Sequence, residues 1–187
     1  MLLQGQFKQG WIDFAYRFLA GTREHYPVDT HWNDEPIGDK HLLVHFEQGL
    51  GDTIMFSRFL PLAQRLCGKL TFECQRTLVD LLRHSFPGID IVAEGEAPTD
   101  FDVHLPLLTL GERLGLDETN LLGDKAYLTP PYQAPLPDSG RLRVGLAWAG
   151  NPHHKNDANR SIAWKQFATL TELDEVDFFS LQVGPRA

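Results

Sequence analysis

The sequence has little cysteine, few basic residues and no long hydrophobic run. Its 187 residues include two cysteines, Cys67 and Cys74, with no C-x-x-C pair, so a disulfide framework is not indicated. No signal-peptide region follows Met1, and no apolar run approaches the roughly 20 residues that a membrane span needs, so we expect a cytoplasmic protein. The net charge of −8 argues against a nucleic-acid partner, because such proteins bind phosphates with a basic surface.

The composition is that of a globular protein. With 42% hydrophobic and 22% charged residues, the chain is expected to form a packed core. Its length leaves room for one domain, or for one domain and part of another.

Strand and helix patterns alternate through residues 38–128. This alternation, with short connections, predicts an α/β, Rossmann-like parallel sheet with helices on both faces. Pro61 lies inside the first helical pattern and predicts a kink or break near residue 60. The predicted strands are His41–Phe46, Lys69–Cys74, Ile89–Val92 and Phe101–Leu105, and the predicted helices are 52–66, Leu78–His84 and Leu107–Leu114.

Residues 1–30 form an N-terminal helical segment in this prediction. Its apolar residues recur at helical spacing along one stripe, and Gly5 and Gly10 divide it into two short helices. The stripe contains Leu3, Phe7, Trp11, Phe14, Ala15 and Phe18. The pattern resembles the closing unit of a tetratricopeptide array, and one such unit cannot bury its own face. The stripe is therefore expected to dock on the domain that follows, on upstream repeats, or on a protein partner. Residues 21–40 are predicted to form an irregular connector, in which Trp32 is expected to act as an apolar pin that anchors the connector.

A second, incomplete α/β domain is expected at residues 141–187. Residues 129–140 form a linker by composition, with prolines at 130, 131, 135 and 137. A buried strand is predicted at Leu142–Ala149, then a helix capped by Ser161, then a strand at Asp177–Gln182. These elements begin an α/β domain without completing it.

The turn Gln48–Ile54 is the first candidate site. It joins a strand to a helix through Gly49 and Gly51, and it leaves unpaired backbone N–H groups at the start of the helix. Asp52 in the first helical turn is explained either by capping alone or by a role as general base toward a sugar hydroxyl. Gln48, Gly49, Gly51 and Thr53 belong to the same candidate loop. A dinucleotide site formed by Gly49, Gly51 and Glu73 is a weaker alternative, because the third glycine of that fingerprint is missing.

The loop Asn151–Ser161 is the second candidate site. Lys155, Asn159, Arg160 and Ser161 gather hydrogen-bond donors and positive charge before a predicted helix, which favours a diphosphate group. A solvated surface loop is the alternative. Metal binding by His153, His154 and Asp157 is not favoured, because adjacent histidines point in different directions.

Taken together and in this order, the two loops resemble a bacterial glycosyltransferase family. The stretches concerned are Glu47-Gln48-Gly49-Leu50-Gly51-Asp52-Thr53-Ile54, Val144-Gly145-Leu146-Ala147-Trp148-Ala149-Gly150-Asn151-Pro152, Lys155-Asn156-Asp157 and Asn159-Arg160-Ser161-Ile162. They are similar to the tetratricopeptide-containing relatives of the lipopolysaccharide heptosyltransferases.

This resemblance implies a GT-B architecture, of which this chain holds the N-terminal half and the start of the second domain. It implies that Asp52 is the base and that Arg160, with Lys155 second, contacts the donor phosphates. It also implies that the loop with Gln48, Gly49, Gly51 and Thr53 binds the acceptor. The donor substrate would be a nucleotide-sugar and the acceptor a glycan or a protein, with no metal or further cofactor. Family members continue for well over another hundred residues, so we expect little transferase activity from the chain as it stands.

The sequence is also compatible with two rival functions. One is a non-catalytic interaction or remnant module that docks through the N-terminal stripe. The other is a nicotinamide-type oxidoreductase, in which Glu73 would bind the ribose.

Overall fold

The computed structural model divides the chain into two compact units, and it describes residues 1–19, 25–121, 123, 125–133, 135, 136 and 138–184. Unit 1 is Met1–Gln133 and unit 2 is Ala134–Ala187. Residues 20–24 of the predicted helical segment and Pro137 of the predicted linker lie outside the described residues. Among the described helices, none is long and apolar enough to cross a membrane.

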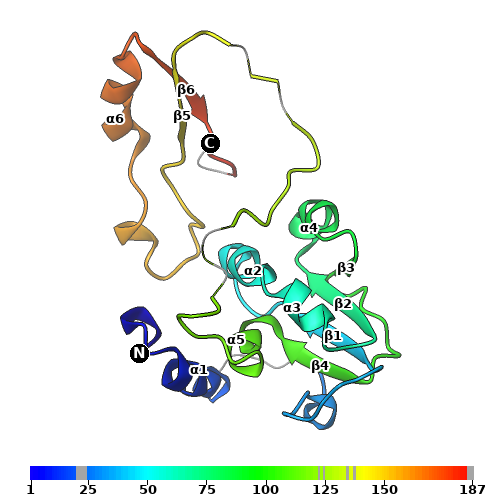
Figure 1. Ribbon diagram of the computed structural model, residues 1–187. Coiled ribbons are helices and arrows are strands. Elements are labelled where there is room, and N and C mark those ends of the chain that lie inside the picture. The colour runs from blue at the N-terminus through cyan, green and yellow to red at the C-terminus, as the bar shows by residue number, and fades with distance from the viewer. Residues whose placement is uncertain (20–24, 122, 124, 134, 137, 185–187) are drawn as a thin grey trace. The chain divides into compact units, whose positions relative to one another are not determined.

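Unit 1 contains a parallel sheet of four strands in the order β3-β2-β1-β4 (Figure 1). The strands are β1 (His41–His45), β2 (Lys69–Cys74), β3 (Asp90–Ala93) and β4 (Val103–Pro106). The helices are α1 (Phe7–Ala15), α2 (Leu50–Ser57), α3 (Leu60–Gln64), α4 (Val79–Ser85) and α5 (Leu110–Arg113). Short 3₁₀ helices occur at Leu2–Gln4, Tyr16–Phe18, Val28–Thr30, Arg76–Leu78 and Leu107–Thr109. The predicted parallel α/β sheet is confirmed.

One face of this sheet is apolar and packs against helices. Alternate strand residues such as Leu42 and Phe72 are fully buried in one core with side chains of α2, α3 and α4. The predicted break near residue 60 is confirmed, since α2 ends at Ser57 and α3 begins at Leu60 with Pro61 in its first turn. Proline fits there because the first turn needs no N–H donor.

The opposite face of the sheet is polar and still buried. His45 and His104 lie on it with ring centroids 5.3 Å apart, and Glu73 is 3% exposed. The connector covers this face: the Tyr26 ring lies 4.9 Å from that of His45, and the His104 ring nitrogen Nε2 lies 2.8 Å from the Pro27 carbonyl oxygen. The prediction of helices on both faces is therefore wrong for this face. Connector residues, rich in hydrogen-bonding groups, cover it instead.

The N-terminal helical stripe docks on unit 1 itself. Trp11 is 8% exposed, its indole N–H donates to the carbonyl of Leu116 (2.7 Å), and its ring meets that of Phe56 edge-on. Leu3 was predicted on the stripe but is fully exposed, because the chain turns at Gly5 and presents Leu2 to the core instead. The buried residues of the stripe are thus already packed against unit 1. Trp32, the expected pin, is 6% exposed and confirms that prediction.

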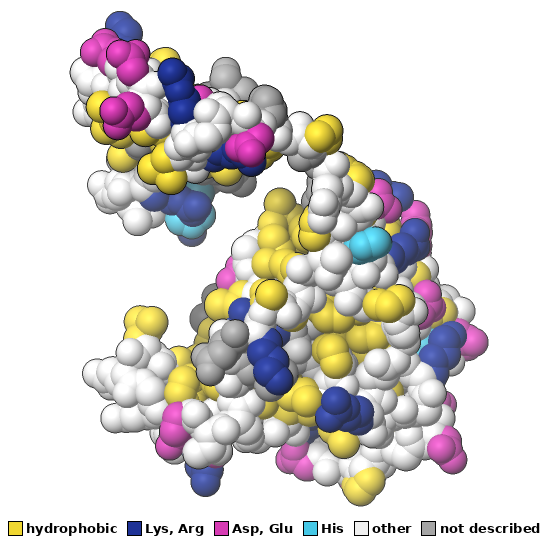
Figure 2. All heavy atoms as spheres, turned by 45° about the horizontal axis from the view of Figure 1, so that its top comes forward, with side chains coloured by type: hydrophobic (Ala, Val, Ile, Leu, Met, Phe, Trp, Pro, Cys, Tyr) yellow, Lys and Arg dark blue, Asp and Glu magenta, His cyan; other side chains and the backbone are white. Residues whose placement is uncertain are grey.

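Unit 2 is a smaller β-α-β arrangement. Strands β5 (Leu142–Leu146) and β6 (Val176–Ser180) pair in parallel, and α6 (Trp164–Phe167) continues into a 3₁₀ helix at Ala168–Glu172. The prediction of a buried strand is wrong, since the side chains of β5 are exposed or half-buried. Figure 2 accordingly shows hydrophobic side chains at the surface of this unit. The strand has one pairing partner within the described residues and few atoms over its faces.

Candidate functional site

The Gln48–Ile54 turn lies at the carboxyl end of β1. The chain runs outward from β1 to β2 and β3, then returns to place β4 on the other side of β1. The strand order therefore reverses between β1 and β4. Open parallel sheets bind ligands beyond the carboxyl ends of the strands at such a reversal. The turn is where a ligand site is expected in this fold.

Asp52 has a defined position in this turn. It lies in the first turn of α2, is partly exposed, and its Oδ2 accepts the N–H of the N-cap residue Gly49 at 3.1 Å. This bond satisfies one of the donors left free at the helix start. Capping thus engages one carboxylate oxygen, while Oδ1 makes no recorded hydrogen bond among the described residues. The capping and base interpretations are compatible.

The two glycines of the turn differ in what surrounds them. A Cβ on Gly49 would lie 3.3 Å from Asp52 Oδ2, whereas a Cβ on Gly51 would meet nothing within 4 Å. Neither has a positive φ. The fold therefore does not require glycine at position 51. A side chain at position 51 would extend into open space.

The flanking residues of the turn divide between surface and core. Gln48 is exposed, and its carbonyl accepts a hydrogen bond from the side-chain amide of Gln75 (2.9 Å). Thr53 is 1% exposed, on the inner side of α2. The Thr53 side chain therefore points into the protein, where it cannot touch an acceptor directly.

A buried ion pair beneath the turn was missed by sequence reasoning. The guanidinium of Arg17 forms a two-pronged pair with Glu47, with N–O distances of 2.8 and 2.9 Å. Glu47 is the first residue of the stretch Glu47–Ile54 that resembles the glycosyltransferase family, but no spacing rule links it to a residue 30 positions upstream. The signal available was the acid itself, placed directly after a buried strand.

Glu73 does not serve as a ribose-binding residue in this structure. Its two carboxylate oxygens accept hydrogen bonds from the Tyr26 hydroxyl and the Gly95 N–H, each at 2.8 Å, beneath the connector. Burial and the Glu73 carboxylate together raise the pKa of Tyr26. The dinucleotide alternative loses its acidic residue, because Glu73 belongs to the interior of β2.

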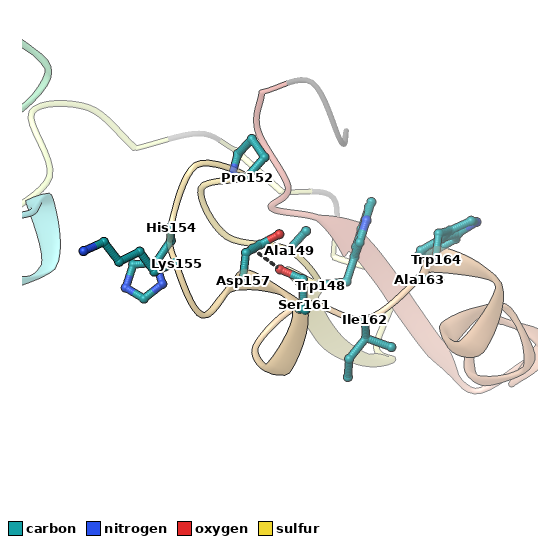
Figure 3. Close-up of a pocket in the computed structure, with 11 residues that line it drawn as sticks. Trp148, Ala149, Pro152, His154, Lys155, Asp157, Ser161, Ile162, Ala163 and Trp164 are labelled. Atoms are coloured by element: carbon teal, nitrogen blue, oxygen red, sulfur yellow. Dashed lines mark hydrogen bonds between the residues drawn. The ribbon is translucent and has the colours of Figure 1, made fainter.

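The second candidate loop lines an open pocket of about 720 Å³ in unit 2 (Figure 3). Trp148 and Trp164 lie at one end with ring centroids 4.6 Å apart, and His154 and Lys155 lie at the other. Between them the Ser161 hydroxyl donates to Asp157 Oδ1 (2.6 Å) and accepts the Gly150 N–H (3.1 Å). The pocket thus offers an aromatic end and a cationic end.

The structure brings only some of the predicted phosphate-binding residues together. Lys155 and Ser161 line the pocket, whereas Asn159 and Arg160 are not among its lining residues. Asn159 donates to the Asn156 side chain (2.6 Å), and the Arg160 guanidinium packs over Gly150.

Ser161 was predicted to cap the following helix, and this is wrong. Its hydroxyl is taken by Asp157 and Gly150, and the Ile162 N–H donates to the Trp148 carbonyl (2.8 Å). The helix consequently begins later, with Ala163 as the N-cap residue.

The described residues contain no group of three or more His, Cys, Asp or Glu arranged to hold a metal ion. Cys67 and Cys74 are both free thiols.

The fold of this chain is a mixed α/β fold with a four-stranded parallel sheet, and it is similar to that of a glycosyltransferase. The similar structure is the iron-containing dodecameric glycosyltransferase TibC from enterotoxigenic E. coli H10407. The TM-score is 0.56 at 16% sequence identity, over 80% of this chain and 43% of TibC. A second TibC structure, described as a heptosyltransferase in complex with ADP-D-β-D-heptose, matches with the same TM-score over 78% of this chain.

Comparison by sequence finds a more limited match. The chain is 28% identical over 99 residues to protein FlbA of Caulobacter vibrioides, a stretch that covers 50% of this chain and 17% of FlbA. No protein-family model matches the chain. The chain spans less than half the length of TibC and about a sixth of FlbA.

Proposed function

We propose that this chain is part of a GT-B glycosyltransferase of the heptosyltransferase type, which transfers a sugar from a nucleotide-sugar to a glycan or protein acceptor in the cytoplasm. The observation that carries the proposal is Asp52, a partly exposed carboxylate in the first turn of the helix that begins at the strand-order reversal of a glycosyltransferase-like sheet. Unit 1 would bind the acceptor. Unit 2 would be the beginning of the donor domain.

Asp52 would act as the general base in this reaction. An inverting transfer requires removal of a proton from the acceptor hydroxyl as that oxygen attacks the anomeric carbon. The Oδ1 atom of Asp52 would accept this proton while Oδ2 remains bonded to the Gly49 N–H, so the capping bond would hold the base in place. A positioned base contributes about 10²–10⁴-fold to the rate.

The donor phosphates would lie at the cationic end of the unit 2 pocket. Lys155 would make the main contact with these phosphates, because it lines the pocket and Arg160 does not. Positive charge stabilises the diphosphate leaving group without a metal ion. The iron of TibC is not carried over to this chain, since no set of metal ligands occurs among the described residues.

The test is an Asp52→Asn substitution in the full-length protein, with ADP-D-β-D-heptose as the first donor probe in a panel of nucleotide-sugars. Asparagine can still accept the Gly49 N–H through its amide oxygen, so the fold is expected to remain intact. Sugar transfer, followed by mass spectrometry of the acceptor, should fall at least 100-fold.

Asp80→Asn is the matched control. Asp80 is likewise an acid in the first turn of a helix, α4, but it is not part of the turn and is exposed. This variant should transfer sugar at the wild-type rate. If Asp52→Asn keeps full turnover, the assignment of the base is wrong.

A stable monomer that binds no nucleotide-sugar or glycan would instead favour the non-catalytic module. Binding is measured by titration of the donor against the fluorescence of Trp148 and Trp164.

A further inference from the structure

The Arg17 side chain is held on all sides by described residues. Its guanidinium donates to both carboxylate oxygens of Glu47, to the Thr109 hydroxyl (2.6 Å) and to the Phe14 carbonyl (3.0 Å). The rings of Phe14 and Phe18 lie 4.6 and 4.2 Å from its central carbon. Arg17 is therefore fixed in one orientation.

Glu47 is equally constrained. Its side chain is 1% exposed, that of Arg17 is 9% exposed, and Glu47 Oε1 also accepts the Leu108 N–H at 3.0 Å. One carboxylate thus joins three segments: the N-terminal helical segment, the end of β1, and the turn that follows β4.

Stability alone is a poor explanation for such a pair. Removing two charges from water costs free energy that their attraction often does no more than recover, and apolar residues of similar volume commonly do as well. What a two-pronged Arg–carboxylate pair adds is a defined geometry, which a lysine cannot reproduce.

The geometry that this pair defines is that of the Gln48–Ile54 turn. Glu47 is the residue directly before the turn, and the backbone on its other side is fixed by the Phe46 N–H bond to the Glu73 carbonyl (2.9 Å). Gln75 holds the Gln48 carbonyl from the side. Asp52 lies at the far end of this short, anchored loop.

We propose that Arg17 is a positioning residue, which acts through Glu47 to hold the turn and its Asp52 in the orientation needed for transfer. The inference rests on the proposed function for its role in catalysis. It gives the N-terminal helical segment a part in the site that the sequence assigned only to residues 48–53.

The test compares Arg17→Lys with an Arg17→Gln/Glu47→Gln double variant in the full-length protein. The lysine variant keeps the charge and loses the two-pronged geometry, and the double variant leaves no buried charge unpaired. Hydrogen exchange of the amides from Glu47 to Thr53 should accelerate at least 10-fold in both variants, with amides of β2 and β3 unchanged. With ADP-D-β-D-heptose, or whichever donor supports transfer, kcat should fall at least 10-fold with little change in the KM for the donor.

Leu82→Ala is the matched control for lost stability. Leu82 is fully buried in α4, so its truncation weakens unit 1 without touching the turn. This variant should leave kcat and the turn's exchange rates unchanged. The proposal is overturned if the turn exchanges at the wild-type rate in both Arg17 variants, or if exchange rises equally throughout unit 1.

Failure of the proposed function has a different signature. In that case the wild-type protein transfers no sugar from any donor tested, while the turn still exchanges faster in both Arg17 variants.

Discussion

Strands β1 and β5 hold matching places in their units but have different surroundings. Both are five residues long, both lead into a polar loop and then a helix, and both pair in parallel. Every residue of β1 is buried, whereas every residue of β5 is exposed or half-buried. The difference lies in the layers around them: β1 has a strand on each side, helices over one face and the connector over the other. A local sequence pattern predicts that a strand forms, but whether the strand is buried depends on elements elsewhere in the chain.

A pair of core truncations tests this contrast most strongly. Phe72 in β2 is fully buried, and Phe178 in β6 is half-buried. Phe72→Ala should lower the free energy of unfolding of unit 1 by about 3–5 kcal/mol, and Phe178→Ala should lower that of unit 2 by about 1–2 kcal/mol. Each unit contains two tryptophans, so denaturant unfolding followed by fluorescence in Trp148→Phe/Trp164→Phe and Trp11→Phe/Trp32→Phe backgrounds separates the two transitions. Equal losses would mean that unit 2 is packed as tightly as unit 1.

Acid is expected to weaken unit 1 and spare unit 2. Burial, and then the neighbouring His104, lower the pKa of His45 to about 3. An unfolded histidine has a pKa of about 6.5, so between these values the unfolded chain binds more protons than the folded one. The stability that neutral His45 allows is therefore complete above about pH 6.5 and is lost as the pH falls toward 3, by a few kcal/mol in total.

The other groups near His45 are His25, His31, Tyr26 and Glu73, so the comparison needs a variant at His45 itself. His45→Gln should flatten the decline, measured as the urea midpoint of unit 1 from pH 7 to pH 4. Both histidines of unit 2, His153 and His154, are exposed. A decline of the same steepness in His45→Gln would assign it to other groups.

A pair of glycine substitutions gives the smallest expected effect and separates the fold from the site. A Cβ on Gly111 would lie 2.7 Å from the Trp11 ring, so Gly111→Ala should cost about 1–3 kcal/mol by forcing the N-terminal helix away. Gly51→Ala meets open space and should raise stability by up to about 1 kcal/mol through helix propensity. The same Gly51→Ala change should reduce sugar transfer, because the proposed acceptor approaches the turn through the open space at this position. Unreduced transfer would show that no substrate occupies that space.

The elements of unit 1 could largely be predicted from the sequence, because each depends on local patterns. Strand β1 has three consecutive apolar residues at its centre, and Pro61 marks the break between α2 and α3 through its missing N–H. The polar face of the sheet could not be predicted, because His45, Glu73 and His104 are tolerated in the interior only once the connector supplies their partners. The Arg17–Glu47 pair could not be predicted either, because its two residues are 30 positions apart in the sequence and meet only in the folded chain.

The candidate site divides in a similar way. The turn and Asp52 were visible, since a strand, two glycines and an acid in a helix's first turn lie within seven residues. The burial of Thr53 could not be read from that stretch, because it depends on which side of α2 faces the core. In unit 2, the choice of Ser161 as a cap failed because Asp157 and Gly150 compete for the same hydroxyl.

The bond from the Trp11 indole to the Leu116 carbonyl joins residues 105 positions apart. A ribosome adds about 5–20 residues per second, so the helix that contains Trp11 is complete roughly 5–20 s before its partner is made. During that interval the indole that later fills the space beside Gly111 is exposed to solvent. Helix α1 is thus among the last parts of unit 1 to reach its final packing, because its hydrogen-bond partner at Leu116 is made 105 residues later.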